Sequence, residues 1–213
     1  MPIKNIILDL GVVIIDVDYN KTAEAFKKLG LSNFDEIYSK KKQDHFFDDF
    51  EKGILDVADF RDEVRTHIAG KLSDRQIDKA WNAMLGRVPH KRVELLESLS
   101  QKYDLYLLSN TNKIHVPAFS KILDEDHDLE KFYSLFKSVY LSCELEMRKP
   151  DKEIFDLVIN ENNLNRDECI FIDDTPHHVE GGKRAGIASF HLADGQDLTE
   201  FLPSLLNREA RKA

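Results

Sequence analysis

Four short segments of this sequence carry side chains that could do chemistry on a bound ligand. They supply carboxylates, a hydroxyl, an amide and a lysine. A carboxylate can act as a nucleophile, and the other groups can hold an anion or a cation in place. In chain order, these side chains belong to Asp9, Ser109, Asn110, Lys149, Asp173 and Asp174.

Each segment taken alone could also have a purely structural role. Asp9, followed by Gly11, could be a turn residue, and Ser109 could cap a helix. Lys149 could be a solvated charge. The adjacent pair Asp173 and Asp174 is a stronger indication of a bound cation, because adjacent like charges cost free energy unless a cation offsets them. Hard oxygen ligands of this kind suit magnesium.

The pattern of apolar runs predicts the elements that position these side chains. Short runs rich in β-branched residues predict core strands at 3–8, 105–108, 138–141, 169–172 and 188–192. Helical spacing predicts helices at 91–102, 151–162 and 176–185, and the basic tail is expected to end a further helix. Alternating strands and helices indicate an α/β fold with a Rossmann-like, doubly wound parallel sheet. In such sheets ligands bind at the carboxyl ends of the strands, where the candidate residues lie.

The distance between the first two candidate segments indicates an insertion. Asp9 and Ser109 are 100 positions apart, whereas a βαβ unit needs only about 30 residues. Helical spacing recurs in the surplus, at 20–29, 56–69 and 73–85. We therefore predict a small helical-bundle cap at 17–86, inserted after the first strand, and a catalytic core formed by 1–16 and 87–213.

Composition narrows the range of partners. Thirty Lys plus Arg against 39 Asp plus Glu give a net charge of −9, which disfavours nucleic acids and anionic membranes as ligands. The chain shows no signal peptide and no apolar run of about 20 residues. Its two cysteines fit a reducing compartment. We expect a cytoplasmic protein, monomeric or weakly dimeric, that acts on a small molecule.

Taken together, from Ile3 to about Leu192, the four segments resemble the motif series of the haloacid dehalogenase superfamily. The resemblance implies that Asp9 is a nucleophile and that Lys149 binds the substrate phosphate. It also implies that Ser109 and Asn110 contact the phosphate. Mg²⁺ would be held by Asp9, by the Gly11 carbonyl and by Asp173 or Asp174.

Four phrases of the sequence most resemble bacterial phosphatases of sugar 1-phosphates. They are Asp9-Leu10-Gly11, Ser109-Asn110-Thr111-Asn112, Arg148-Lys149-Pro150 and Phe50-Glu51-Lys52-Gly53. The resemblance implies a magnesium-dependent phosphatase of a small phosphorylated metabolite, such as a hexose 1-phosphate. The reaction would pass through an aspartyl-phosphate intermediate on the first aspartate.

The sequence departs from the commonest pattern of that superfamily at Gly11. Most members carry an aspartate there, which serves as general acid and base, and glycine cannot donate a proton. Asp16 and Asp18 could replace it, although capping the next helix is the simpler role. Two alternatives stay open. One is a 2-haloacid dehalogenase, which would have little use for paired acids, and the other is a binding domain that has lost catalysis.

Two further groups are expected to be structural. His177 and His178 follow the paired acids without zinc-ligand spacing, so we expect exposed loop residues. The second group, His45, Phe46, Phe47 and Phe50, is expected to form the core of the cap rather than to line the substrate.

Overall fold

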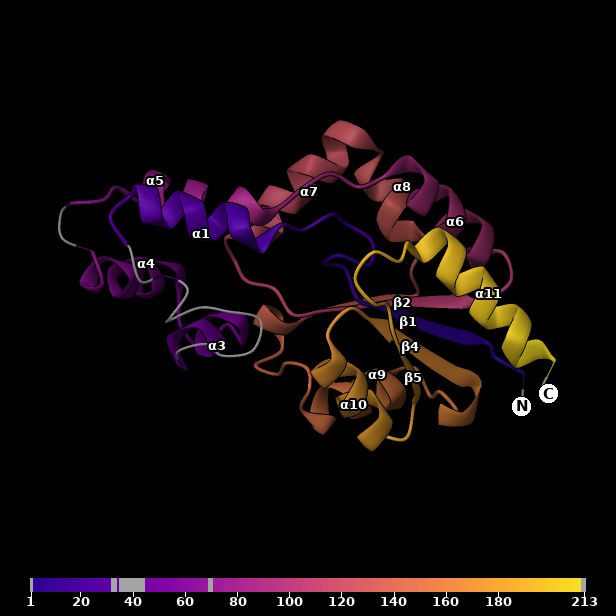
Figure 1. Cartoon of the computed structure of the whole chain (residues 1–213). Helices are drawn as coiled ribbons and strands as arrows, with labels where there is room; N and C mark the ends of the chain where they lie inside the picture. The colour runs from indigo at the N-terminus through magenta and orange to yellow at the C-terminus, as the bar shows by residue number, and fades with distance from the viewer. Residues whose placement is uncertain (1, 32–33, 35–44, 69–70, 212–213) are drawn as a thin grey trace.

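The computed structural model describes residues 2–31, 34, 45–68 and 71–211. Its centre is a five-stranded parallel sheet in the order β3-β2-β1-β4-β5 (Figure 1). The strands are β1 (Asn5–Leu8), β2 (Asp104–Ser109), β3 (Ser138–Leu141), β4 (Cys169–Asp173) and β5 (Ala188–His191). The order reverses direction between β1 and β4. Ligands of open α/β sheets bind at such a reversal.

Helices cover both faces of the sheet (Figure 1). One face packs against α6 (His90–Ser100), α7 (His115–Asp126), α8 (Leu129–Ser134) and α11 (Leu198–Ala210). The other packs against α9 (Lys152–Glu161) and α10 (Pro176–Arg184). Within β1, Ile6 and Leu8 belong to the first core and Ile7 to the second. Because both faces are covered, the strands are continuous apolar runs.

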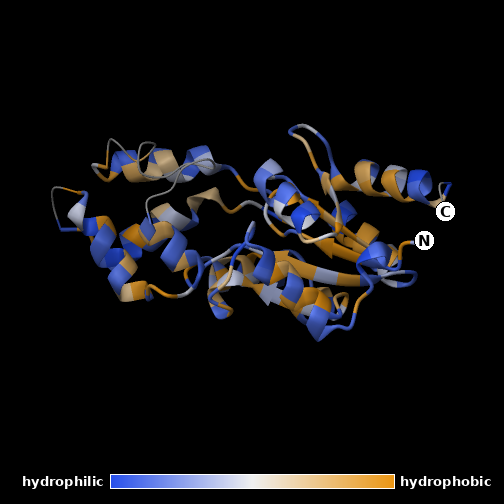
Figure 2. Cartoon of the chain, turned by 90° about the horizontal axis from the view of Figure 1, so that it is seen from below, coloured by the Kyte–Doolittle hydropathy of each residue, from blue (hydrophilic) through white to orange (hydrophobic). Residues whose placement is uncertain are grey.

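The hydropathy of the elements follows this layering. In Figure 2 the strands form an apolar centre, while the helices around them carry apolar and polar stretches in alternation. Such helices bury one side and expose the other. Among the described residues, none of the helices combines the length and the apolar character needed to cross a bilayer.

The predicted fold class is confirmed, since the five strands lie where the apolar runs placed them. The helices predicted at 91–102, 151–162 and 176–185 are α6, α9 and α10, each within about two residues of the predicted ends. Helices α7 and α8 were not predicted. Helix α11 was predicted only as the helical end of the basic tail.

The segment between β1 and α6 contains helices, and no strand element is found in its described part. They are α1 (Tyr19–Lys28), α3 (His45–Glu51), α4 (Val57–Thr66) and α5 (Asp74–Trp81), followed by the short η1 (Asn82–Met84). We call α1, α3, α4 and α5 the insertion helices. Figure 1 shows them beyond one end of the sheet, far from both termini. The assignment of 17–86 as a separate cap domain stays a prediction.

The insertion helices have an apolar core of their own, built largely from aromatic rings. Phe47 and Phe50 are buried in it, as expected from the sequence, and Phe46 packs against it while partly exposed. His45 is exposed, so the prediction was wrong for that residue. Phe50 stacks on Phe60 with 4.0 Å between ring centroids, and Phe47 stacks on Trp81 at 5.4 Å. Offset and edge contacts of this kind add to the free energy gained by burying the rings.

Two chain segments, 16–18 and 84–87, connect the insertion helices to the sheet and run side by side. They are paired antiparallel through the bridge between Val17 and Leu85. Backbone hydrogen bonds flank that bridge, from Gly86 N to Asp16 O at 2.7 Å, from Asp18 N to Met84 O at 2.9 Å and from Asp16 N to Arg87 O at 2.9 Å. A Cβ at Gly86 would lie 2.7 Å from Asp16 O, so only glycine permits this approach. We call the paired segments the connecting ribbon.

Candidate active site

Asp9 directly follows β1 at the reversal of strand order. Its backbone N–H donates to the carbonyl of Ile172 on β4 at 3.0 Å, which holds the aspartate beside the end of that strand. The chain then turns sharply, with Val12 at φ 62° and Val13 N donating to the Gly11 carbonyl at 2.6 Å. A non-glycine residue at positive φ is uncommon and often marks a functional turn.

Lys149 lies at the centre of the site and is fully buried. Its Nζ donates to Asp9 Oδ1 at 2.7 Å, to Asp173 Oδ2 at 2.6 Å and to the Leu108 carbonyl at 2.8 Å. Burial by itself lowers the pKa of Lys149, but the carboxylates of Asp173 and Asp9 outweigh that effect and raise the pKa above its usual value. The ammonium group therefore stays charged.

Asn110 fixes the backbone that carries this lysine. The Asn110 amide Nδ2 donates to the Lys149 carbonyl at 2.9 Å, and Lys149 N donates to Asn110 Oδ1 at 2.9 Å. Both bonds are made by a side chain at the carboxyl end of β2. The lysine loop and the loop after β2 therefore keep a fixed relative position.

The two carboxylates at the end of β4, Asp173 and Asp174, have different surroundings. Both oxygens of Asp173 are in use, because Oδ2 accepts from Lys149 and Oδ1 from Thr175 N at 2.8 Å. His178 Nδ1 lies 3.1 Å from the same Oδ1. Burial acts to raise the pKa of Asp173, but Lys149 and His178 hold it well below its usual range. Asp174 is also buried, and its backbone carbonyl faces His191 Nε2 at 2.9 Å.

The carboxylates of Asp9, Asp173 and Asp174 form a cluster whose oxygens can all lie within 4.8 Å of one another. Burial raises the pKa of Asp9 to about 7, against the attraction of Lys149 and with help from the charges of Asp173 and Asp174. Three carboxylates face one lysine, so the ionised cluster carries two excess negative charges. A buried set of hard oxygen donors with this charge fits a divalent cation such as Mg²⁺.

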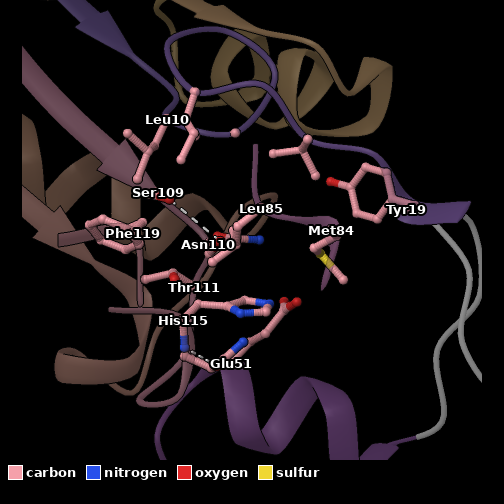
Figure 3. Close-up of a pocket in the computed structure, with 14 residues that line it drawn as sticks. Leu10, Tyr19, Glu51, Met84, Leu85, Ser109, Asn110, Thr111, His115 and Phe119 are labelled. Carbon is pink, nitrogen blue, oxygen red and sulfur yellow. Dashed lines mark hydrogen bonds between the residues drawn. The ribbon is translucent and has the colours of Figure 1, made fainter. Parts of the chain in front are cut away.

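A pocket opens next to this cluster, between the sheet and the insertion helices (Figure 3). The core contributes Gly11, Ser109 and Asn110, and the Ser109 side chain is almost fully buried there. The chain from the insertion side contributes Tyr19, Glu51, Met84 and Leu85. The residues expected to bind a phosphate and residues of the inserted segment therefore line one pocket.

Glu51 and Gly53 bring α3 and the residues after it against the core. Ser142 Oγ lies 2.6 Å from the Glu51 carbonyl and also accepts from Thr111 N at 2.9 Å. Gly53 has φ 73°, and a Cβ there would lie only 2.1 Å from the Cys143 carbonyl oxygen. These contacts place the end of α3 against the residues that follow β3, and Ser142 links it to the loop after β2.

The structure brings the residues singled out in the sequence into one region. Asp9, Lys149 and Asp173 are in direct contact, Asp174 belongs to the same cluster, and Gly11, Ser109 and Asn110 line the adjoining pocket. The two possible replacements for the missing acid lie elsewhere. Asp18 accepts from Asn20 N as the N-cap of α1, and Asp16 pairs with Arg92 at 3.0 Å.

The expectation for His178 was wrong, whereas His177 is exposed. Pro176 begins α10, so both histidines belong to the first turn of a helix rather than to a loop. His178 lies three residues before Gly181 and seven before Ala185, both of which are buried. That helical spacing was a signal for an inward-facing side chain.

Comparison with known proteins agrees with this geometry. A family model described as haloacid dehalogenase-like hydrolase matches residues 3–186. A D-ribitol-5-phosphate phosphatase from Bacteroides thetaiotaomicron is 32% identical over 210 residues, which cover 96% of this chain and 99% of the relative.

Solved structures similar to this chain include enzymes of the same family. A HAD family enzyme from B. thetaiotaomicron, in complex with magnesium and inorganic phosphate, has a TM-score of 0.82 and 36% identity. The match covers 93% of this chain and 98% of that one. A HAD-like family hydrolase from Porphyromonas gingivalis has a TM-score of 0.85 and 29% identity, with coverage of 97% and 98%.

Proposed function

Because this chain belongs to the haloacid dehalogenase-like hydrolase family, we propose that it is a magnesium-dependent phosphatase of a small phosphorylated sugar or polyol. The observation that carries the proposal is the buried contact of Lys149 with Asp9 and Asp173, at the reversal of strand order. The relative named as a phosphatase and the magnesium and phosphate in a similar structure support it.

Asp9, Asp174 and the carbonyl of Gly11 are the groups that would hold Mg²⁺. Asp173 is less suited, because Lys149, Thr175 N and His178 already engage its oxygens. The Gly11 carbonyl accepts one hydrogen bond from Val13 and keeps a second lone pair. When bound, the ion would neutralise charge on the phosphate and on the carboxylates around it.

Asp9 is the proposed nucleophile. One oxygen of its carboxylate forms a bond to phosphorus, and the ester oxygen leaves with the electron pair of the broken bond. Water then attacks the aspartyl phosphate, which releases inorganic phosphate and restores the carboxylate. Lys149 balances negative charge beside the reacting oxygens throughout, and Ser109 and Asn110 hold the phosphate in line with the attack.

Gly11 leaves the departing oxygen without a carboxylic acid at the usual position, and neither Asp16 nor Asp18 reaches the pocket. This favours an ester with a good leaving group, such as a sugar 1-phosphate, whose anomeric oxygen leaves as a hemiacetal anion. The relative named for D-ribitol 5-phosphate favours a polyol phosphate instead. The two candidates share a hydroxylated carbon chain next to the phosphate.

A panel of phosphate esters tests the proposal and separates the candidates. It contains p-nitrophenyl phosphate, D-ribitol 5-phosphate and hexose 1- and 6-phosphates, each assayed with Mg²⁺ and with excess chelator. We expect hydrolysis that requires Mg²⁺ and is fastest on one of the hydroxylated esters. Full activity in chelator, or release of halide from a 2-haloacid, would favour the dehalogenase alternative. A folded protein without activity on any ester would favour the binding domain.

A further inference from the structure

The pocket beside the phosphate-binding residues contains a buried hydrogen-bond donor that lacks a partner. Asn112 is 1% exposed, and its Oδ1 accepts from Ile114 N at 3.1 Å and from His115 N at 3.0 Å, at the start of α7. These two bonds fix the orientation of the amide. Its Nδ2 has no hydrogen-bond partner among the described residues. Native proteins rarely leave a buried donor without a water, an ion or a ligand group to accept its hydrogen bond.

His115 supplies an acceptor to the same pocket. Its Nδ1 lies 2.8 Å from the Asn82 side-chain oxygen, which places the ring hydrogen on Nδ1 and leaves Nε2 as an acceptor. The ring stacks parallel to Trp81 at 5.2 Å, and Figure 3 shows it reaching into the pocket. Burial lowers the pKa of His115 to about 3, so the ring is neutral at physiological pH.

Glu51 brings a negative charge to the pocket from the insertion side. Its carboxylate, at the end of α3, pairs with Arg148 at 2.9 Å, and Arg148 also pairs with Asp48. Glu51 is nearly buried and lines the pocket with Asn112 and His115. A carboxylate accepts hydrogen bonds from hydroxyl groups and repels other anions.

We infer that Asn112, His115 and Glu51 form the subsite for the leaving group of the substrate. The subsite recognises an uncharged, polyhydroxylated carbon chain through one donor and two acceptors, and it rejects leaving groups that carry a negative charge. Met84, Leu85 and Phe119 line the same pocket and supply apolar contacts for the carbon chain. The inference rests on the proposed phosphatase function and names its substrate class.

Two conservative substitutions test the subsite. Asn112→Asp keeps an oxygen to cap α7 but replaces the unpaired donor with an acceptor. We expect kcat/KM for D-ribitol 5-phosphate to fall at least about tenfold relative to kcat/KM for p-nitrophenyl phosphate, which lacks hydroxyl groups. Glu51→Gln removes the negative charge. We expect the preference for D-ribitol 5-phosphate over the anionic ester phosphoglycolate to fall at least about tenfold.

Asn207→Asp and Glu144→Gln are the matched controls, because both residues are exposed and neither lines the pocket. They should leave both ratios unchanged. Circular dichroism and thermal unfolding establish that each variant is folded. If either Asn112→Asp or Glu51→Gln does not fold, the other substitution still tests the subsite. Hydrolysis of p-nitrophenyl phosphate by the wild type, with unchanged ratios in the folded subsite variants, would overturn the subsite alone. Failure of the wild type to hydrolyse any ester would overturn the proposed function and this inference with it.

Discussion

His115 should make the protein less stable in mild acid. Its ordinary pKa of 6.5 falls to about 3 in the folded protein because the ring is buried. The folded state therefore resists protonation, while the unfolded state takes up a proton as the pH falls below about 6.5. Stability contributed by the neutral ring is complete above that pH and is lost progressively towards pH 3.

The size of the effect follows from these two values. Between about pH 7.5 and pH 5 the unfolded state gains nearly one proton at this residue, and the folded state gains almost none. The free energy of unfolding should fall by about 1.36 kcal/mol for each of about 1.5 effective pH units, or about 2 kcal/mol. Because pH 5 still lies above the pKa of His115 in the folded state, the size of this fall depends mainly on the pKa in the unfolded state.

Urea unfolding at the two pH values measures the effect in the wild type and in His115→Gln and His115→Phe. Glutamine keeps a hydrogen-bonding group, phenylalanine keeps a ring against Trp81, and neither titrates. Other groups, including Asp9, contribute their own pH dependence, which the comparison between proteins cancels. Each variant should lose about 2 kcal/mol less than the wild type on acidification, and exposed His177→Gln should behave like the wild type. Equal losses in all four proteins would show that His115 takes up its proton in the folded state.

Three further substitutions test the chemistry and the packing. Asp9→Asn should abolish turnover and leave folding intact, because the amide lacks the attacking charge; activity within about tenfold of the wild type would exclude the covalent mechanism. Gly11→Asp should raise single-turnover rates on esters with poor leaving groups by up to about 10²-fold, since its Cβ has room at 3.6 Å from the nearest side chain; an unchanged dependence on leaving-group acidity would mean that another residue already donates the proton. In urea unfolding, Gly53→Ala should lower the free energy of unfolding by at least about 2 kcal/mol more than Gly195→Ala does. Both glycines have positive φ, but only at Gly53 would the added Cβ clash with a backbone oxygen. Equal losses in the free energy of unfolding would show that small backbone shifts relieve this contact.

The sheet could be predicted from the sequence because its strands are buried on both faces. A short apolar run that ends in a turn, such as the run ending at Asp173, is typical of a buried parallel strand. The candidate residues could be grouped for the same reason, since all strands are parallel and their carboxyl ends share one edge. The helices between β2 and β3 were harder. The N-cap residue Asp128 separates α7 from the short helix α8, and it resembles an ordinary polar residue in the sequence.

The pocket beyond the phosphate-binding residues could not be predicted. Glu51 and His115 are 64 positions apart and line it together because the end of α3 packs against the core. That placement depends on tertiary contacts, such as Ser142 with the Glu51 carbonyl, which leave no periodic pattern. The unpaired amide of Asn112 is equally invisible, because only the structure shows which of its atoms cap the helix.

The connecting ribbon constrains how the insertion helices can move. Sliding or twisting these two paired segments against each other would break the hydrogen bonds between Asp16, Gly86 and Arg87, whereas bending across the plane of the ribbon would leave them intact. We therefore expect any movement of the insertion helices on this ribbon to be mainly a bend across its plane. A bend of that kind would move Glu51 towards or away from the core without sliding it sideways, so the ribbon would preserve the alignment of Glu51 with His115 and Asn112, which line the same pocket.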